Sequence, residues 1–87
     1  MEIYLTGKFK KNYAVLPAQI KRKTETTERI FRKNPYHPSL RTHSLQGKYK
    51  DYWSFWVGKS YRIMFQFLDA TKTKVVFINI GTHEIYK

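Results

Sequence analysis

Cysteine is absent from this sequence and acidic residues are scarce. Without cysteine the chain can form no disulfide, no thiolate nucleophile and no zinc-finger scaffold. The longest apolar stretches reach about half the length of a membrane span, and the amino terminus lacks the apolar core of a signal peptide. We therefore expect a cytoplasmic protein.

The motifs of several common catalytic sites are also missing. The sequence contains no glycine-rich phosphate loop, no HExxH, no CxxC and no Ser-His-Asp arrangement. A metal site is disfavoured, because Glu84 is the one acidic residue near a histidine and no pair of ligands is spaced four residues apart. The sequence therefore predicts neither a metal nor another cofactor.

Positive charge is the abundant component. Seventeen Lys and Arg residues against six Asp and Glu leave a net charge of +11 and a pI near 10.0. Residues 1–44 carry ten basic and three acidic side chains, and residues 45–87 carry seven and three, so no basic tail explains the excess. A folded basic surface predicts a polyanionic partner, with nucleic acid the leading class. The alternative is a surface that serves only solubility.

Length and apolar content predict a single domain over residues 1–87. Hydrophobic residues make up 41% of the chain and aromatic residues 17%, enough for one small core. Periodicity predicts a short strand at Ile3, a helix beginning near Thr6, and a second helix from Pro17 to Asn34. Three strands follow, at residues 52–57, 61–68 and 75–80. The predicted fold is α+β, with both helices on one face of an antiparallel meander.

Strand alternation assigns the side chains of this meander to two faces. The face expected beneath the helices carries Trp53, Phe55, Val57, Tyr61, Ile63, Phe65, Phe67, Val76, Ile78 and Ile80. The other face carries Tyr52, Ser54, Trp56, Arg62, Met64 and Gln66. An arginine beside a tryptophan on an uncovered face suits a nucleic-acid platform, because aromatic rings stack on bases and guanidinium holds phosphate. Two alternatives are that helix or loop residues cover Trp56, and that Arg62 pairs with Asp51 or Asp69.

Two of the three histidines are candidates for proton transfer. His37 lies in a proline-containing loop and is predicted to be inert. His43 precedes the meander and His83 follows its last strand, so both flank the strands whose outer face carries Arg62. Histidine is the side chain best suited to move protons near neutral pH, although a single histidine is commonly structural.

Four short runs resemble motifs of the RelE/ParE superfamily of toxins. They are LRTHSLQG at residues 40–47, DYWS at 51–54, SYRI at 60–63 and IGTHEIY at 80–86. The His-x-Leu-x-Gly and Gly-Thr-His pieces are most similar to the YafQ branch. The order and spacing of the runs and the length of the chain agree with the superfamily, so the resemblance covers nearly all 87 residues. The predicted succession of strand, two helices and meander agrees with its architecture.

The resemblance implies the toxin of a type II toxin–antitoxin system, an mRNA endoribonuclease that works in the ribosomal A site without a metal. In that reaction the 2′-hydroxyl attacks the phosphorus, a cation holds the phosphate oxygens and an acid protonates the departing 5′-oxygen. By position, the resemblance implies catalytic roles for His43, Arg62, His83 and Tyr86. The expected RNA contacts are Lys48, Lys50, Ser54, Trp56 and Lys59.

The chain departs from the well-known branches in its first meander strand. RelE-type members place lysines there and YafQ-type members an aspartate and a histidine, where this chain has Ser54 and Trp56. Ser60 and Tyr61 replace the acidic–aromatic pair of YafQ-type members. The resemblance therefore leaves the general base unassigned. ParE-type toxins share the scaffold and block DNA gyrase without nuclease chemistry, which is one alternative; a stand-alone RNA-binding domain is another.

The resemblance and the charge together imply an acidic antitoxin as protein partner, alongside the ribosome with its mRNA. Such antitoxins commonly end in a segment that folds on binding. We expect that segment to lie over the face bearing Arg62, or to displace residues 81–87. Charge should steer the encounter more than it holds the complex.

Overall fold

A computed structural model describes residues 1–86, and Lys87, the last residue of the predicted domain, lies outside the described residues. The helices are α1 (Gly7–Ala14) and α2 (Ala18–Lys33). The strands are β1 (Glu2–Leu5), β2 (His43–Ser44), β3 (Trp53–Val57), β4 (Tyr61–Phe67) and β5 (Lys74–Gly81). They form one sheet in the order β1-β5-β4-β3-β2, in which β1 runs parallel to β5 and the other neighbours are antiparallel. The α+β prediction is confirmed.

Capping residues and prolines set the ends of the two helices. The Thr6 hydroxyl accepts a hydrogen bond from the Phe9 amide at 3.0 Å and so caps α1. Pro17 immediately precedes α2, and Asn34 ends it because Pro35 disfavours a helical residue before it. None of the helices within residues 1–86 is long and apolar enough to cross a membrane.

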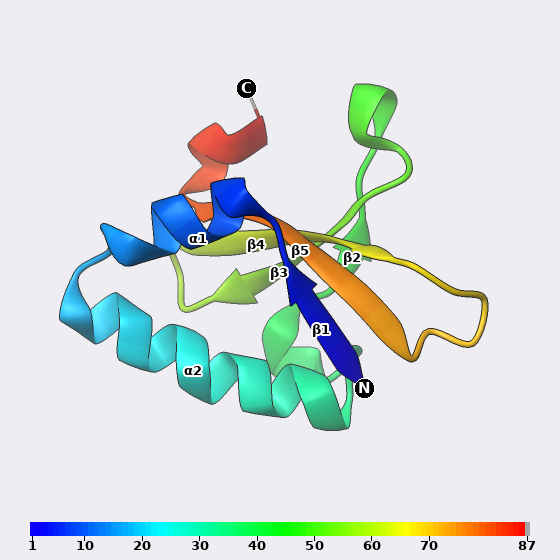
Figure 1. The fold of residues 1–87 in the computed structure, drawn as a ribbon, viewed down its shortest axis with the longest axis horizontal. Coiled ribbons are helices and arrows are strands. Elements are labelled where there is room, and N and C mark those ends of the chain that lie inside the picture. The colour runs from blue at the N-terminus through cyan, green and yellow to red at the C-terminus, as the bar shows by residue number, and fades with distance from the viewer. Residues whose placement is uncertain (87) are drawn as a thin grey trace.

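The ring of Phe31 on α2 is fully buried at the centre of the core. Its centroid lies 4.6 Å from that of Phe55, 5.0 Å from Phe65 and 5.5 Å from Phe77, so one helical residue contacts three neighbouring strands. Phe9 of α1 packs on Phe77 at 5.5 Å. In Figure 1, α2 lies below the sheet and the C-terminal segment above it. The aromatic core therefore lies between the sheet and the two helices.

The predicted inward face of β5 is wrong for two of its three residues. Val75 and Phe77 are buried in the core, whereas Val76 and Ile78 are only half-buried. The cause is a bulge, because Phe65 pairs with Phe77 while Met64 pairs with Asn79, which leaves Ile78 as an extra residue. One extra residue reverses the alternation, so Ile80 faces the core as predicted.

The bulge also joins the sheet to α1. The Thr6 hydroxyl donates a 2.7 Å hydrogen bond to the carbonyl of Ile78, and the Thr6 amide donates to the carbonyl of Phe77 at 3.2 Å. The carbonyl of Ile78, the extra residue at the bulge, thus has a hydrogen-bond partner. Thr6 serves both as the cap of α1 and as a clamp on β5.

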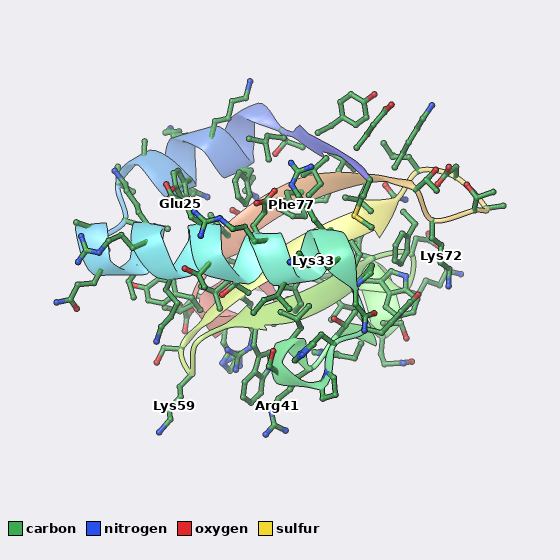
Figure 2. All side chains as sticks on the ribbon, turned by 90° about the horizontal axis from the view of Figure 1, so that it is seen from below. Glu25, Lys33, Arg41, Lys59, Lys72 and Phe77 are labelled. Atoms are coloured by element: carbon green, nitrogen blue, oxygen red, sulfur yellow. The ribbon has the colours of Figure 1, made fainter. Side chains whose placement is uncertain are left out.

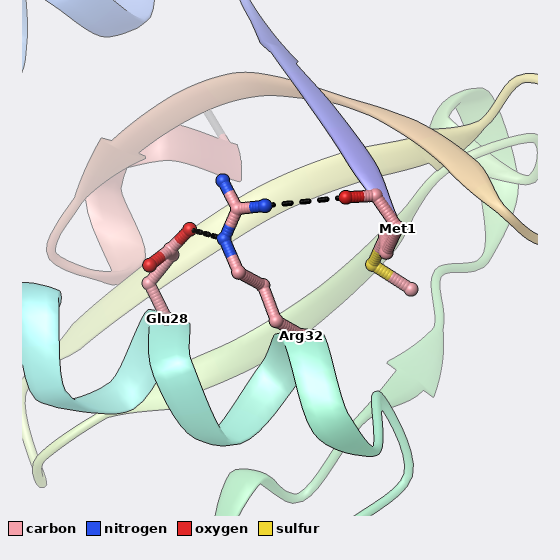
Figure 3. Close-up of polar contacts among 3 residues, drawn as sticks. All are labelled: Met1, Glu28 and Arg32. Carbon is pink, nitrogen blue, oxygen red and sulfur yellow. Dashed lines mark hydrogen bonds and ion pairs between the residues drawn. The ribbon is translucent and has the colours of Figure 1, made fainter.

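The carboxyl-terminal end of α2 is tied to the start of the chain. Arg32 pairs with Glu28 one turn earlier and donates to the Met1 carbonyl at 3.2 Å, as Figure 3 shows. This contact holds β1 beside the helix. In Figure 2, α2 crosses in front of the sheet, and Arg41 and Lys59 project outward on the same side of the molecule.

Candidate functional site

His43 lies on β2, opposite Ser54 of β3. Its side chain is exposed, and Nδ1 lies 2.7 Å from the carbonyl oxygen of Arg41. A carbonyl only accepts hydrogen bonds, so Nδ1 carries the proton and donates it. In neutral imidazole this leaves the lone pair on Nε2, which is the form a general base requires. The structure therefore places an oriented proton acceptor at this edge of the sheet.

Ser54 is fully buried, although the sequence predicts it on an open RNA-binding face. Its hydroxyl forms a short hydrogen bond with the hydroxyl of Tyr86, which belongs to the 3₁₀ turn His83–Tyr86. Met64, the register partner of Ser54 on β4, is also buried. The prediction of an uncovered sheet face is therefore wrong at Ser54 and Met64, because the C-terminal turn returns over that face (Figure 1).

Arg62 lies on the same face, near the start of the central strand β4 and therefore at one end of the sheet. It is opposite Trp56 on β3 and opposite Gly81 on β5. One guanidinium nitrogen donates to the carbonyls of Lys59 and Tyr61, at 3.1 and 3.0 Å. Within residues 1–86 the guanidinium forms no ion pair, so the proposed partners Asp51 and Asp69 do not hold it. Its charge remains available to an external anion.

Trp56 does not offer a bare ring to a base. The guanidinium carbon of Arg62 lies 4.2 Å from the indole centroid, and that of Arg41 lies 4.7 Å from it. Both are cation–π distances. Arg41 comes from the loop after the helices. The structure therefore agrees better with the alternative that loop residues cover Trp56 than with the prediction of an open stacking platform.

His83 shares a hollow with Arg62. It is exposed, and a cavity of about 280 Å³ is lined by Lys59, Ser60, Arg62, Thr82, His83 and Glu84. The His83 ring is 6.2 Å from that of Tyr86 in the same turn. Gly81 precedes this turn and a Cβ there would meet Ile85 at 2.6 Å, so glycine permits the sharp return of the chain.

The three lysines predicted to contact RNA fall in two places. Lys59 lines the cavity with Arg62 and His83. Lys48 and Lys50 are exposed in the loop between β2 and β3, which projects from the same side of the sheet as the C-terminal turn (Figure 1). Lys48 lies over the ring of Tyr49 at 5.2 Å. Lys48 and Lys50 do not line the cavity that contains Arg62.

The predicted catalytic residues thus lie on one side of the sheet. His43 adjoins Ser54, Ser54 bonds Tyr86, and Arg62 shares a cavity with His83. His43 is in line with Ser54 and Met64 across β2, β3 and β4, and Arg62 lies two residues from Met64, so the backbones of His43 and Arg62 are roughly 12 Å apart. No group of three metal-binding side chains occurs among the described residues.

No protein-family model and no curated protein matches the sequence. Solved structures do match over nearly the whole chain. The YoeB/ParE toxin from Agrobacterium tumefaciens aligns with a TM-score of 0.79 at 17% identity, covering 95% of this chain and 99% of that one. The chain has the fold of the RelE, ParE and YafQ toxins.

Two further structures support this RelE/ParE-type fold. YafQ from E. coli aligns with a TM-score of 0.75 at 21% identity, over 98% of this chain and 96% of that chain. The RelBE2 toxin–antitoxin complex from Mycobacterium tuberculosis aligns with a TM-score of 0.73 at 17% identity, over 93% and 95%. The coverage means that the shared fold includes nearly the whole chain.

Arg41 is the residue that sequence reasoning missed. It has a left-handed backbone, with φ 50° and ψ 41°, and ends the 3₁₀ turn Pro38–Leu40. Glycine and asparagine signal that conformation in a sequence, whereas arginine does not. The one sequence signal for a role of Arg41 in the site is its position two residues before His43. The turn Pro38–Leu40 is what brings its carbonyl to the His43 ring.

Proposed function

We propose that this chain is the toxin of a type II toxin–antitoxin system and cleaves mRNA on the ribosome. The observation that carries the proposal is the convergence of His43, Arg62, His83 and Tyr86 on one side of the sheet, from three separate parts of the chain: β2, β4 and the C-terminal turn. The RelE/ParE-type fold and the net charge of +11 support the same conclusion. A cytoplasmic site of action follows from the proposed target.

The proposed reaction is a transesterification with balanced proton transfer. Nε2 of His43 removes the proton of the 2′-hydroxyl, and the resulting oxygen attacks the adjacent phosphorus. Arg62 holds the non-bridging oxygens as negative charge develops on them. The bond to the 5′-oxygen breaks, and His83 in its protonated form supplies the proton to that oxygen. The products are a 2′,3′-cyclic phosphate and a free 5′-hydroxyl.

Each assignment depends on a contact in the site. The hydrogen bond from Nδ1 to Arg41 favours the basic Nε2 of His43. Arg62 is held by two carbonyls yet has no carboxylate partner within residues 1–86. His83 is exposed and lines a cavity of about 280 Å³ together with Arg62. Tyr86 is bonded to Ser54, so we assign it to holding the C-terminal turn in place.

An acidic antitoxin is the proposed protein partner. The RelBE2 structure is that of a toxin–antitoxin complex, and the basic charge of this chain suits an acidic protein. We expect the antitoxin to bind over Arg62 or to displace the turn that carries His83. Association rates measured at two ionic strengths test the electrostatic part, which predicts slower association at higher salt. A salt-independent rate would contradict it.

Primer extension on a cellular message after brief induction tests the nuclease function. Cleavage in phase with codons supports the proposal, and a His83→Ala variant expressed at the same level controls for indirect effects. The alternative is gyrase inhibition, the activity of ParE-type toxins, which share this fold. It predicts DNA-damage signalling with intact message, and that result would refute the nuclease proposal.

A further inference from the structure

Two arginines far apart in the sequence meet over one tryptophan ring. The guanidinium carbons of Arg41 and Arg62 lie 4.7 and 4.2 Å from the centroid of Trp56, so they are no more than about 9 Å apart. Neither forms an ion pair with a carboxylate in the part of the chain that the structure describes. Two positive charges are therefore held close together, and neither is in an ion pair with a described carboxylate.

The backbone of Arg41 is specialised for this position. A left-handed conformation is uncommon for a side chain of this size, and Arg41 adopts it at φ 50°. The conformation is maintained by its neighbours, because Leu40 is buried in the core and the Arg41 amide donates to the Pro38 carbonyl at 3.3 Å. An unfavourable backbone retained beside candidate catalytic groups indicates a constraint from function.

The same residue also contacts the proposed base. Its carbonyl accepts the hydrogen bond from Nδ1 of His43, while its side chain reaches Trp56. Arg41 therefore lies between the group proposed to activate the 2′-hydroxyl and the group proposed to hold the scissile phosphate. A strand of RNA bound at Arg62 and His43 would have its neighbouring phosphate close to Arg41.

We propose that Arg41 and Arg62 form a site for two successive phosphates of one RNA strand, with Trp56 holding both guanidinium groups. This inference rests on the proposed function, because it assigns Arg62 to the scissile phosphate and Arg41 to the next one. The indole face stabilises the two like charges when RNA is absent. Planar guanidinium then offers each phosphate two parallel donors.

Salt dependence of binding measures the number of phosphates contacted. For a single strand, the slope of log affinity against log salt changes by about 0.7 for each phosphate neutralised. The probe is a short single-stranded RNA with 2′-O-methyl groups, which cannot be cleaved. Arg41→Gly removes the guanidinium and retains a residue that favours the left-handed backbone, so the fold and the carbonyl bonded to His43 are preserved.

We expect Arg41→Gly to reduce the steepness of the slope by about 0.7 and to weaken binding several-fold. Arg29→Ala is the matched control, because Arg29 is exposed on α2 and its loss changes the net charge equally. Arg41→Lys should keep the slope of the parent while binding more weakly, because an ammonium lacks the planar fork. The inference would be overturned if Arg41→Gly had the same slope as the parent. It would also be overturned if Arg41→Gly and Arg29→Ala reduced the slope by the same amount. Failure of the parent to bind at low salt would also overturn it.

The experiment separates this inference from the proposed function. It needs neither a ribosome nor cleavage. A reduced slope in Arg41→Gly, together with intact message in cells, would refute the nuclease and keep the phosphate site. Codon-phased cleavage by the parent with an unchanged slope in the variant would keep the nuclease and refute the second phosphate contact.

Discussion

The carbonyl oxygen of Arg41 lies 2.7 Å from Nδ1 of His43, and this contact determines which nitrogen of the imidazole can act as a base. The left-handed backbone of Arg41 directs the carbonyl toward β2 and the guanidinium toward Trp56. One residue thereby orients the candidate base and contributes charge to the candidate phosphate site.

His43→Gln should lower the rate of mRNA cleavage by about 10²–10⁴-fold, because general-base catalysis contributes that much. Single-turnover cleavage rates on programmed ribosomes provide the measurement. His37→Gln is the control, since His37 is an exposed histidine bonded to Ser39 outside the site. Parent-like activity in His43→Gln would exclude His43 as the base.

His83→Ala should abolish growth arrest and leave the fold intact. His83 is exposed, so its truncation creates no core cavity, while loss of a general acid costs about 10²–10⁴-fold in rate. Growth after induction and thermal unfolding of the purified variant are the two measurements. A folded variant as toxic as the parent would remove His83 from the mechanism.

Arg62→Lys should retain binding to the ribosome and lose most cleavage. Lysine keeps the charge, yet it has no planar fork for two phosphate oxygens. Ribosome cosedimentation and single-turnover cleavage separate these effects. A variant of unchanged thermal stability that cleaves as fast as the parent would rule out the bidentate role.

Tyr86→Phe should destabilise the protein by about 1–3 kcal/mol, because the buried hydroxyl of Ser54 then lacks its partner. Ser54→Ala removes the other hydroxyl. In the double variant the loss should be smaller than the sum of the single losses, since the two groups form one interaction. Urea unfolding of all four proteins measures this coupling. Strictly additive losses would show that the hydrogen bond contributes nothing.

Asp69 should stabilise the β4–β5 turn at neutral pH and lose that effect in acid. Hydrogen bonds from Thr73, Thr71 and Lys74 hold the pKa of its carboxyl well below the ordinary value of 3.8. A carboxyl with a lowered folded-state pKa stabilises the fold at pH values above its unfolded-state pKa. This stabilisation is lost as the pH falls toward the folded-state pKa.

The melting temperature of Asp69→Ala should therefore lie below that of the parent at about pH 7, and the difference should shrink below about pH 3. Asp51→Ala removes the same charge from another turn and is the control. A difference between Asp69→Ala and parent that does not vary with pH would contradict the role of the ionised carboxyl.

The helices and the core were largely predictable because their signals are local. The end of α2 at Asn34 follows from Pro35, and the burial of Phe31 follows from helical spacing with Thr24 and Thr27. The placement of Phe55 and Ile63 follows from strand alternation. Arg62 and Trp56 were likewise predicted to be cross-strand neighbours on the outer face, and their pairing in register agrees.

The sequence by itself determined the α+β order of elements, the basic charge and the helix ends, because each depends on residues a few positions apart. Only the tertiary structure decided the face of Val76, the partner of Ser54 and the position of Arg41. A single bulge at Ile78 reverses the alternation of β5, the hydroxyl of Tyr86 reaches Ser54 from the chain's far end, and packing of the surrounding loop holds Arg41 left-handed. Such contacts join residues that are distant in sequence, so no local periodicity encodes them.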